Sequence, residues 1–369
     1  MKSAFSLGES NCESLGEFGA SRTRALCSAL GFHERDTLAA LALFRLISSS
    51  WAERPVGAQP PFRNDITDDG TPFEFSVGFE AKKPELRLLF ESQLAREETS
   101  PRSSWEAGLE LQRQLQQRGE ADTTRFDSIA ALFAPPANDG LLRFSLWHAA
   151  VLRPSAAPLF KAYVNPEIMG VEHATTLVGD ALARLNMSSA WRFVQGRLDG
   201  KARLPYMSLD LEASRQARVK IYLSATHADA AEELLAGSAN FARGDAGSWL
   251  RRLTNREGHY TKRPLLVCLS FTEDGKAPAA TLHVPVRSYL SSDEEALRRT
   301  VPLLPDASAA QLTSAMTALA TRPLSESRGI LSYVSLRPVQ GRVRVTTYLS
   351  PGAYSVAADH HSSGTHPKG

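Results

Sequence analysis

Five pairs of segments with alternating polar and apolar residues limit the fold of this chain more than any other feature of its sequence. Alternation of this kind, enriched in β-branched and aromatic residues, predicts strands with one apolar and one polar face. Turn-forming residues join the two segments of each pair, which predicts β-hairpins. The hairpins begin near Pro72, Leu141, Tyr206, Pro264 and Ile330, roughly 60 to 70 residues apart, and this spacing indicates a repeat architecture.

The segments between the hairpins have apolar residues at three- and four-residue spacing, which is typical of amphipathic helices. HATTLVGDALARL and ASAAQLTSAMTALA are two examples. Consecutive antiparallel strands can form a sandwich or a closed barrel, and closure removes exposed strand edges while helices cover the apolar outer face. We therefore predict an α+β fold: a closed ten-stranded antiparallel β-barrel of five αββα repeats inside an outer ring of helices.

A single barrel domain is predicted over residues 21–356, although the length of 369 residues alone would allow two or three domains. Residues 1–20 and 357–369 are rich in small and polar side chains and are predicted to be disordered. The N-terminus lacks the basic and apolar regions of a signal peptide, and no apolar run reaches the roughly eighteen residues of a membrane span. We expect a cytoplasmic protein.

Charge and cysteine content argue against several classes of function. The 42 Lys and Arg residues nearly balance the 40 Asp and Glu residues, so no overall field draws the protein to nucleic acid or to a membrane surface. The three cysteines, Cys12, Cys27 and Cys268, lack C-x-x-C spacing, which argues against a disulfide framework and a structural zinc site. The expected partners are small molecules bound at a local site, in a monomer or a homodimer.

The polar face of the predicted barrel carries the residues that indicate a function. In the first strand, Phe73, Phe75 and Val77 share one face while Glu74 and Ser76 share the other. Because ten strands exceed the roughly eight that side chains alone can fill, we expect the second face to line a ligand cavity. The same alternation places in this lumen the residues Arg87, Lys161, Tyr163, Arg218, Lys220, Tyr222, Thr281, His283, Arg344 and Tyr348.

A group of lysines and arginines inside a barrel is unfavourable without an anion, because desolvated like charges repel one another. A diphosphate would supply the missing negative charge. Tyrosine hydroxyls could donate hydrogen bonds to it, and the ring faces could shield an allylic carbocation by cation–π attraction. The alternative is a solvated strand face with ordinary lysines, arginines and tyrosines, but four strands share the pattern, which favours a site that ionises a prenyl diphosphate.

Two sets of carboxylates have competing interpretations. Asp65, Asp68 and Asp69 lie in NDITDDG, where a turn before the first strand is a better explanation than a metal site, so we predict no metal cofactor. Glu74 is a carboxylate in the middle of an otherwise apolar alternation. It could accept a hydrogen bond from an indole N–H or a phenol O–H and activate the ring, or it could pair with a lumen arginine for structural reasons.

Five strings of residues resemble the dimethylallyltryptophan synthase family of indole prenyltransferases: TPFEFS, FKAYVNP, ARVKIYLS, HVPVRSYL and RVTTYLSPGAYS. The resemblance extends from about Ser50 to Tyr354, and it is carried by the order and spacing of these strings. The resemblance implies a metal-independent prenyltransferase barrel that uses dimethylallyl diphosphate as its co-substrate and prenylates L-tryptophan or a related indole. It also implies that Glu74 contacts the indole nitrogen, and that the cations and tyrosines of the lumen hold the diphosphate and shield the carbocation.

The sequence departs from the family pattern at three lumen positions. Thr281 and His283 occupy places where glutamine and tyrosine are common, and Arg344 stands where a tyrosine is common. We therefore expect fewer tyrosines around the carbocation and altered contacts to the diphosphate.

His148 is the nearest match to a lysine that fungal members of the family offer as a base, and we predict it to be catalytic together with Glu74. Strict alternation places His148 on the outer face, so this role requires a β-bulge. The alternative is a structural histidine beneath a helix. Trp147 and Arg143 lie on the inner face and are predicted to form part of the acceptor pocket.

The predicted function is therefore transfer of a dimethylallyl group to the indole ring of L-tryptophan or a tryptophan derivative, without a cofactor. One alternative keeps the barrel but uses tyrosine, another phenol or a cyclic dipeptide as the acceptor. An alternative of another class is a non-catalytic barrel that binds an isoprenoid or an anionic lipid.

Overall fold

The computed structural model describes residues 13–57, 59–60, 64–79, 83–94, 100–136, 144–198, 200, 202–256 and 258–354. The strands within these ranges are β1 (Phe73–Gly78), β2 (Glu85–Glu91), β3 (Leu146–Leu152), β4 (Leu159–Val164), β5 (Tyr206–Asp210), β6 (Val219–Ala225), β7 (Leu265–Phe271), β8 (Ala279–Val284), β9 (Leu331–Val339) and β10 (Arg342–Leu349). Each strand pairs antiparallel with its neighbours in the chain, and β1 closes the barrel by pairing with β10. The predicted ten-stranded barrel is confirmed.

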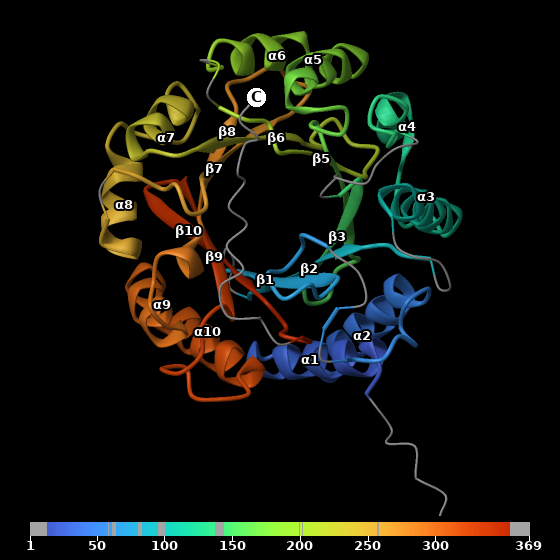
Figure 1. The fold of residues 1–369 in the computed structure, drawn as a ribbon, viewed down its shortest axis with the longest axis vertical. Helices are drawn as coiled ribbons and strands as arrows, with labels where there is room; N and C mark the ends of the chain where they lie inside the picture. Colours follow the sequence, from blue (N-terminus) through green and yellow to red (C-terminus); the bar gives the residue numbers. More distant parts are fainter. Residues whose placement is uncertain are drawn as a thin grey trace, which may run out of the picture.

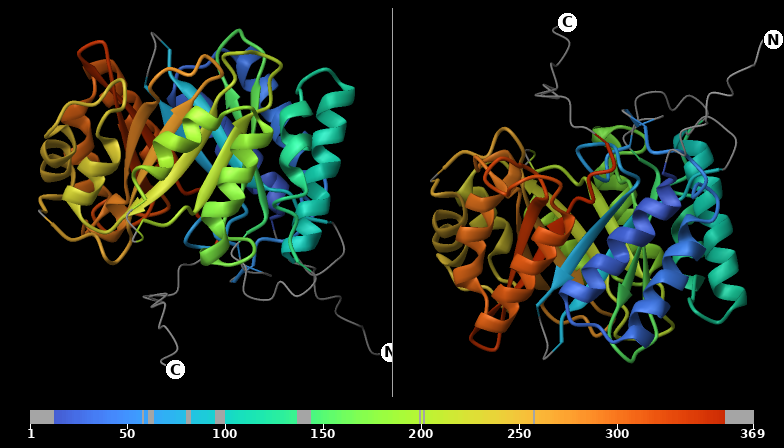
Figure 2. Two further views of the ribbon diagram at one scale, coloured as in Figure 1. Left: turned by 90° about the horizontal axis from the view of Figure 1, so that it is seen from above. Right: turned by 90° about the horizontal axis from the view of Figure 1, so that it is seen from below.

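Helices form a ring around the outside of this barrel (Figure 1). The α-helices of the described residues are α1 (Leu15–Ala29), α2 (Glu34–Ser48), α3 (Pro101–Gln117), α4 (Thr124–Ala130), α5 (Ala174–Arg184), α6 (Ser188–Gln195), α7 (Ala228–Leu235), α8 (Asp245–Thr254), α9 (Asp293–Thr300) and α10 (Asp306–Leu319). Short 3-10 helices are η1 (Val171–His173), η2 (Val286–Ser288) and η3 (Val301–Leu303). Two α-helices precede each hairpin, so five similar units follow one another along the chain (Figures 1 and 2). No helix in the described part of the chain has both the length and the apolar composition that crossing a bilayer requires.

The main apolar core lies between the outer face of the barrel and the helices. The ring of Phe73 on β1 lies 5.2 Å from that of Phe44 on α2 and stacks at 5.8 Å on that of Trp51. Phe75 and Val77 on the same face of β1 are also buried in this core. Burial of each such side chain stabilises the fold by roughly 1.5 to 3 kcal/mol, and the predicted alternation of an apolar outer face with a polar lumen is confirmed.

The strand directions define two ends of the lumen. Because neighbouring strands are antiparallel, odd-numbered strands begin where even-numbered strands end. Glu74 lies near the start of β1, and we call this side the Glu74 end. Arg87 lies near the start of β2, and we call the opposite side the Arg87 end.

Two predicted boundaries differ from the structure. Residues 1–20 were predicted to be disordered, but α1 begins at Leu15, where Ser14 and Glu17 form a capping box and Phe18 is buried. Two orphan backbone donors are thereby satisfied, which explains why a polar stretch begins a helix here. The third predicted strand begins at Leu146 and not near Leu141. Residues 141–143, which include Arg143, and the predicted tail 357–369 lie outside the described residues.

Candidate active site

The strand register turns the predicted ligand residues toward the lumen. Ser76 pairs with Arg87, Ala149 with Lys161, and Ser208 with Lys220, and these pairs share the face opposite the apolar core. The same face continues around the barrel without a change of parity between β1 and β8. The structure thereby brings together, on one inner surface, Arg87, Lys161, Tyr163, Arg218, Lys220, Tyr222, Thr281, His283, Arg344 and Tyr348.

Four of these residues form a group that we call the cationic belt: Arg87, Lys161, Arg218 and Lys220. Asp210 on β5 lies among them, with its carboxylate 2.6 Å from Arg218 Nε and 3.7 Å from Lys161 Nζ. Within the described residues, Asp210 is thus the one carboxylate at ion-pair distance from these two cations, and Lys220 is near enough to add its charge. Three cations around one anion leave an excess of positive charge, which favours a polyanionic ligand.

The electrostatics of the cationic belt favour the binding of an anion. Burial, and then the charge of Lys220, lower the pKa of Lys161 well below its ordinary value. Burial would raise the pKa of Asp210, but the charges of Lys161 and Arg218 outweigh it and lower that pKa to about 2. A diphosphate would supply further negative charge, restore the pKa of the lysines and relieve their repulsion.

Gly78 makes space for Arg87 at the Arg87 end. A Cβ atom added at Gly78 would lie 2.9 Å from an Nη atom of Arg87, which is closer than real Cβ contacts. Arg87 Nη2 lies 2.8 Å from Glu85, and Nη1 donates to Thr346 Oγ1 at 3.4 Å. The glycine in the strand therefore has a packing reason: it lets a guanidinium cross the lumen face.

Aromatic side chains form a continuous series next to the cationic belt. We call this series the aromatic girdle; in spatial order it consists of Tyr206, Tyr222, His283, Tyr348 and Tyr333. Successive ring centroids lie 5.9, 5.7, 5.7 and 6.3 Å apart. Tyr163 joins it at 6.2 Å from Tyr222. Such spacing is typical of aromatic rings in contact.

His283 fits within this girdle without adding a charge. Burial, and then the charges of Lys220 and Arg87, lower the pKa of His283 to about 3. The imidazole is therefore neutral near pH 7 and does not repel a carbocation. Fewer tyrosines were expected around the carbocation because His283 and Arg344 stand where tyrosines are common. Tyr206 and Tyr333, which the sequence analysis did not single out as lumen residues, add two tyrosines to the same face.

A small apolar cluster lies at the Glu74 end, separate from the main core. Ile66, Phe144 and Trp147 pack together there, and Leu89, Tyr163 and Tyr206 pack against them. Phe144 stacks on Trp147 with ring centroids 4.0 Å apart. Trp147 thus lies on the lumen face of β3, within an apolar and aromatic cluster.

Glu74 is buried at this end of the lumen. Its Oε1 accepts a hydrogen bond from Ser332 Oγ at 2.7 Å. Burial raises the pKa of Glu74 to about 8, and the hydrogen bond from Ser332 opposes this only in part. No ion pair of Glu74 with an arginine is found among the described side chains, so the alternative of a structural ion pair is not supported.

Glu91 is a second buried carboxyl group of the Glu74 end. It pairs across the strands with Trp147, and burial raises its pKa to about 8. The sequence analysis missed Glu91, although alternation along β2 places it on the same face as Arg87 and Leu89.

His148 does not reach the lumen, so its predicted role as a base is wrong. Its Nε2 lies 3.0 Å from Gln112 Nε2 on α3, and its ring stacks at 5.9 Å on Phe90, an outer-face residue of β2. The register of β3 with β2 and β4 contains no bulge. Burial lowers the pKa of His148 to about 3. It is a structural histidine beneath a helix, which was the stated alternative.

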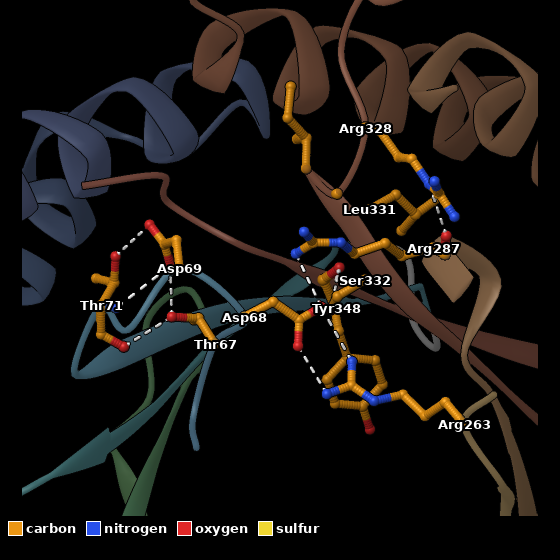
Figure 3. Close-up of polar contacts among 12 residues, drawn as sticks. Thr67, Asp68, Asp69, Thr71, Arg263, Arg287, Arg328, Leu331, Ser332 and Tyr348 are labelled. Atoms are coloured by element: carbon orange, nitrogen blue, oxygen red, sulfur yellow. Dashed lines mark hydrogen bonds and ion pairs between the residues drawn. The ribbon is translucent and has the colours of Figure 1, made fainter. Parts of the chain in front are cut away.

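The aspartates before β1 build a turn, as expected. Asp69 accepts hydrogen bonds from Thr67 Oγ1 and Thr71 Oγ1 (Figure 3). It also accepts one from the backbone N–H of Tyr354. Asp68 instead forms ion pairs with Arg263 and Arg287. In the parts of the chain that the structure describes, no three His, Cys, Asp or Glu side chains are grouped so that they could hold a metal ion.

The family model for tryptophan dimethylallyltransferase matches residues 27–317. The chain belongs to the tryptophan dimethylallyltransferase family. The resemblance seen in the sequence is confirmed, and membership of this family makes the chain an indole prenyltransferase.

Solved prenyltransferase structures resemble this family member over almost their whole length. PriB in a binary complex with product diphosphate has 34% sequence identity and a TM-score of 0.84, covering 93% of this chain and 98% of that one. PriB in a ternary complex with L-tryptophan and dimethylallyl thiolodiphosphate gives 34% identity and a TM-score of 0.83 with the same coverage. The 5-dimethylallyltryptophan synthase of Streptomyces coelicolor gives 32% identity and a TM-score of 0.83, covering 94% of this chain and 100% of that one.

Several residues of this prenyltransferase lumen could have been found by alternation alone. Tyr206 and Tyr333 pair directly with the predicted residues Tyr222 and Tyr348, and Asp210 pairs with Lys161. Arg263 and Arg287 lie outside the strands, where no alternation marks them. Arg344, on the predicted face, pairs with Arg337 at the Arg87 end.

Proposed function

We propose that the protein transfers a dimethylallyl group from dimethylallyl diphosphate to the indole ring of L-tryptophan or a tryptophan derivative, without a metal ion. The observation that carries the proposal is the order of groups along one lumen. The cationic belt lies toward the Arg87 end, the aromatic girdle follows it, and the apolar cluster with Glu74 lies toward the other end. This order matches a donor headgroup, its allylic chain and an aromatic acceptor.

The cationic belt promotes departure of the diphosphate. Lys161, Arg218 and Lys220 are held in place in the free protein around Asp210, so their charges are ready before the C–O bond of the donor breaks. Both electrons of that bond leave with the diphosphate, and fixed charges in a site of low dielectric stabilise this negative charge strongly. The cationic belt thus stabilises the charge of the leaving diphosphate, a role that magnesium held by clustered carboxylates would otherwise have.

The aromatic girdle stabilises the allylic carbocation that remains. Ring faces of Tyr163, Tyr222 and Tyr348 attract a cation by about 0.5 to 2 kcal/mol each. Burial raises the pKa of Tyr222 well above its ordinary value, so this phenol stays protonated and can donate to a phosphate oxygen. The girdle also keeps water away from the cation, which favours attack by the acceptor.

The acceptor ring binds at the Glu74 end, beside the apolar cluster. There the Glu74 carboxyl accepts a hydrogen bond from the indole N–H, which increases the electron density of the ring. A ring carbon then attacks the allylic carbocation and forms the new C–C bond. Rearomatisation then releases one ring proton to a base. His148 lies outside the lumen, but Glu74 and Glu91 are two buried carboxyl groups at this end that can receive it, and a pKa of about 8 suits proton exchange near neutral pH.

Mass spectrometry of the products tests this proposal. Purified protein is incubated with dimethylallyl diphosphate and L-tryptophan in excess EDTA, and a product heavier by one isoprenoid unit is expected. Product that forms only when magnesium is added would contradict the metal-independent mechanism. Prenylation of a phenol or a cyclic dipeptide, with tryptophan untouched, would change the acceptor, and pyrophosphate binding without any turnover would indicate a binding protein.

Two variants test the assignment of Glu74. Glu74→Gln is expected to lower kcat/KM for tryptophan by about 100-fold or more, while pyrophosphate affinity stays within about two-fold. The control is Arg299→Gln, which removes the ion pair of Arg299 with Glu295 on α9, a helix of the outer ring. Equal turnover in Glu74→Gln and the wild type would remove Glu74 from the mechanism.

A further inference from the structure

His283 on β8 lies where the aromatic girdle meets the cationic belt. Its ring centroid is 5.7 Å from that of Tyr222 and 5.7 Å from that of Tyr348. Lys220 and Arg87 of the cationic belt are close enough for their charges to act on the imidazole. Among the residues of the ten described strands, His283 is the one histidine on the lumen face. In the proposed order of groups, the bond between the diphosphate and its allylic chain lies beside this ring.

The half of the barrel that contains His283 has no carboxylate in its strands. β6 to β10 contain no Asp or Glu residue, and the carboxylates of the lumen face lie on β1, β2 and β5. His283 pairs with Leu266 on one side and with Ser335 on the other, and neither side chain is charged.

The lumen groups around His283 supply positive charge or none. The titratable and charged groups on the lumen face of the strands beside it, together with those whose rings or charges reach it, are Lys220 and Tyr222 on β6, Cys268 on β7, Tyr333 and Arg337 on β9, Arg342, Arg344 and Tyr348 on β10, and Arg87 on β2. Burial raises the pKa of the phenols and of the thiol, so these groups are neutral near pH 7.

Diphosphate binding would change the charge around this imidazole. In the free protein, burial and then the charges of Lys220 and Arg87 lower the pKa of His283 to about 3, so the ring is neutral near pH 7. A diphosphate in the cationic belt offsets both charges and gives an imidazolium a hydrogen-bond acceptor, and both effects raise the pKa of the ring. Donor binding and protonation of His283 are therefore linked, because each favours the other.

The acid strength of an imidazolium suits proton transfer near neutral pH. Burial raises the pKa of Tyr222 and of Tyr348, so both phenols donate hydrogen bonds but hold their protons. A tyrosine, which is common at the place of His283 in the family pattern, would have the same limit. A bound diphosphate returns the pKa of Lys220 toward its ordinary value, so this ammonium also keeps its proton.

We propose that His283 is a general acid for the departure of the diphosphate: it takes up a proton when the donor binds and gives that proton to the departing oxygen. As the C–O bond breaks, both of its electrons go to the diphosphate oxygen, which accepts the proton from the imidazolium. The imidazole is neutral again when the allylic carbocation forms beside it, so it does not repel the cation. The inference rests on the proposed prenyl transfer and adds a catalytic residue to it.

NMR of the imidazole nitrogens tests the uptake of the proton. The protein is labelled with nitrogen-15 in its histidines, and the signals of His283 are identified by their loss in His283→Gln. The probe is dimethylallyl thiolodiphosphate, a donor analogue with sulfur in place of the bridging oxygen. Without it the ring should stay neutral down to about pH 5, and with it the ring should be an imidazolium at about pH 6. A ring that stays neutral with the analogue bound would overturn the proposal.

The pH profile of kcat tests the transfer of the proton. With dimethylallyl diphosphate and L-tryptophan, kcat of the wild type should fall on the alkaline side, because the imidazolium of the donor complex loses its proton. We expect His283→Gln to lower kcat about 100-fold and to abolish this alkaline fall. His283→Tyr restores a hydrogen-bond donor but no transferable proton, so its kcat should lie between the two, also without the fall.

A surface histidine provides the matched control for these variants. His173→Gln changes a residue of η1 whose side chain is 58% exposed, and it should keep the wild-type profile. An alkaline fall that persists unchanged in His283→Gln and His283→Tyr would assign the titration to another group and overturn the role of His283.

Hydrolysis of the donor separates this inference from the proposed function. Water that captures the allylic carbocation forms dimethylallyl alcohol, which reports ionisation without an acceptor. If the wild type prenylates no acceptor but releases this alcohol, and His283→Gln loses the release about 100-fold, prenyl transfer fails and the role of His283 stands. Equal release by both proteins, or a wild type that neither prenylates nor releases the alcohol, would overturn that role.

Discussion

Ser332 Oγ lies 2.7 Å from Glu74 Oε1, a contact that joins β9 to β1 across 258 residues of sequence. It depends on a register shift of β9 against β10 at Tyr348 and Leu349, which leaves Ser332 as an extra residue of β9. Such a bulge redirects a side chain. Here it supplies the hydrogen-bond donor that opposes the high pKa of Glu74.

Ser332→Ala is expected to shift the pH dependence of catalysis. The ionised Glu74 is the better acceptor for an indole N–H, so kcat/KM for tryptophan should rise with pH through about 8 in the wild type. Loss of the Ser332 donor removes an interaction that lowers the pKa of Glu74, and the rising limb should move to higher pH. The measurement is a pH–rate profile of both proteins. Coincident limbs would show that this hydrogen bond does not tune Glu74.

Glu74→Gln should make the protein more stable at alkaline pH. The pKa of Glu74 rises on folding from its ordinary 4.5 to about 8, so between these values the folded state retains a proton that the unfolded state has lost. The stability that comes with the neutral carboxyl is full below about pH 4.5 and is lost as pH rises through about 8. Relative to Glu74→Gln, the wild-type free energy of unfolding should fall by up to about 1.4 kcal/mol per pH unit in this window.

Urea unfolding of both proteins at several pH values across that window checks this prediction. A stability difference that does not change with pH would mean that Glu74 titrates near its ordinary value in the folded protein. Ser208→Ala, which alters a non-titrating lumen position on β5, should show no such pH dependence relative to wild type.

Asp210→Asn is expected to lower the folding stability of the ligand-free protein but to increase its affinity for diphosphate. Removal of the carboxylate leaves Lys161 and Arg218 without their shared counter-ion, and breaking such a buried pair costs about 3 to 5 kcal/mol. A diphosphate would relieve the added repulsion, so the Kd for pyrophosphate should fall about ten-fold. Calorimetry and thermal unfolding with and without pyrophosphate measure both effects. Weaker pyrophosphate binding would instead show that Asp210 positions the cations for the ligand.

His148→Gln should separate stability from catalysis. Glutamine can keep a polar atom near Gln112, but it loses the ring that stacks on Phe90, so we expect a loss of about 1 to 3 kcal/mol in stability. Because the histidine lies outside the lumen, kcat should stay within about two-fold. Urea unfolding and steady-state kinetics at one pH provide the two readouts. A large loss of kcat with unchanged stability would restore His148 as a base.

Much of the lumen could be predicted from the sequence, because a period of two residues fixes which side chains share a face of a strand. Lys161, Lys220 and Tyr222 follow from this rule alone. It also places His148 on the outer face, and the structure agrees with the rule and not with the bulge that a catalytic role required.

The amino-acid sequence by itself thus determined the hairpins, the two faces of each strand and the cationic and aromatic character of the lumen, since these depend on local periodicity. Only the tertiary structure decided which loops meet at each end of the barrel. The encounter of Asp68 with Arg263 and Arg287, and the position of Ser332 beside Glu74, depend on how the strands are staggered when the barrel closes. Loops and bulges carry no periodic signal, so their partners become visible only once the packing of the whole chain has brought them together.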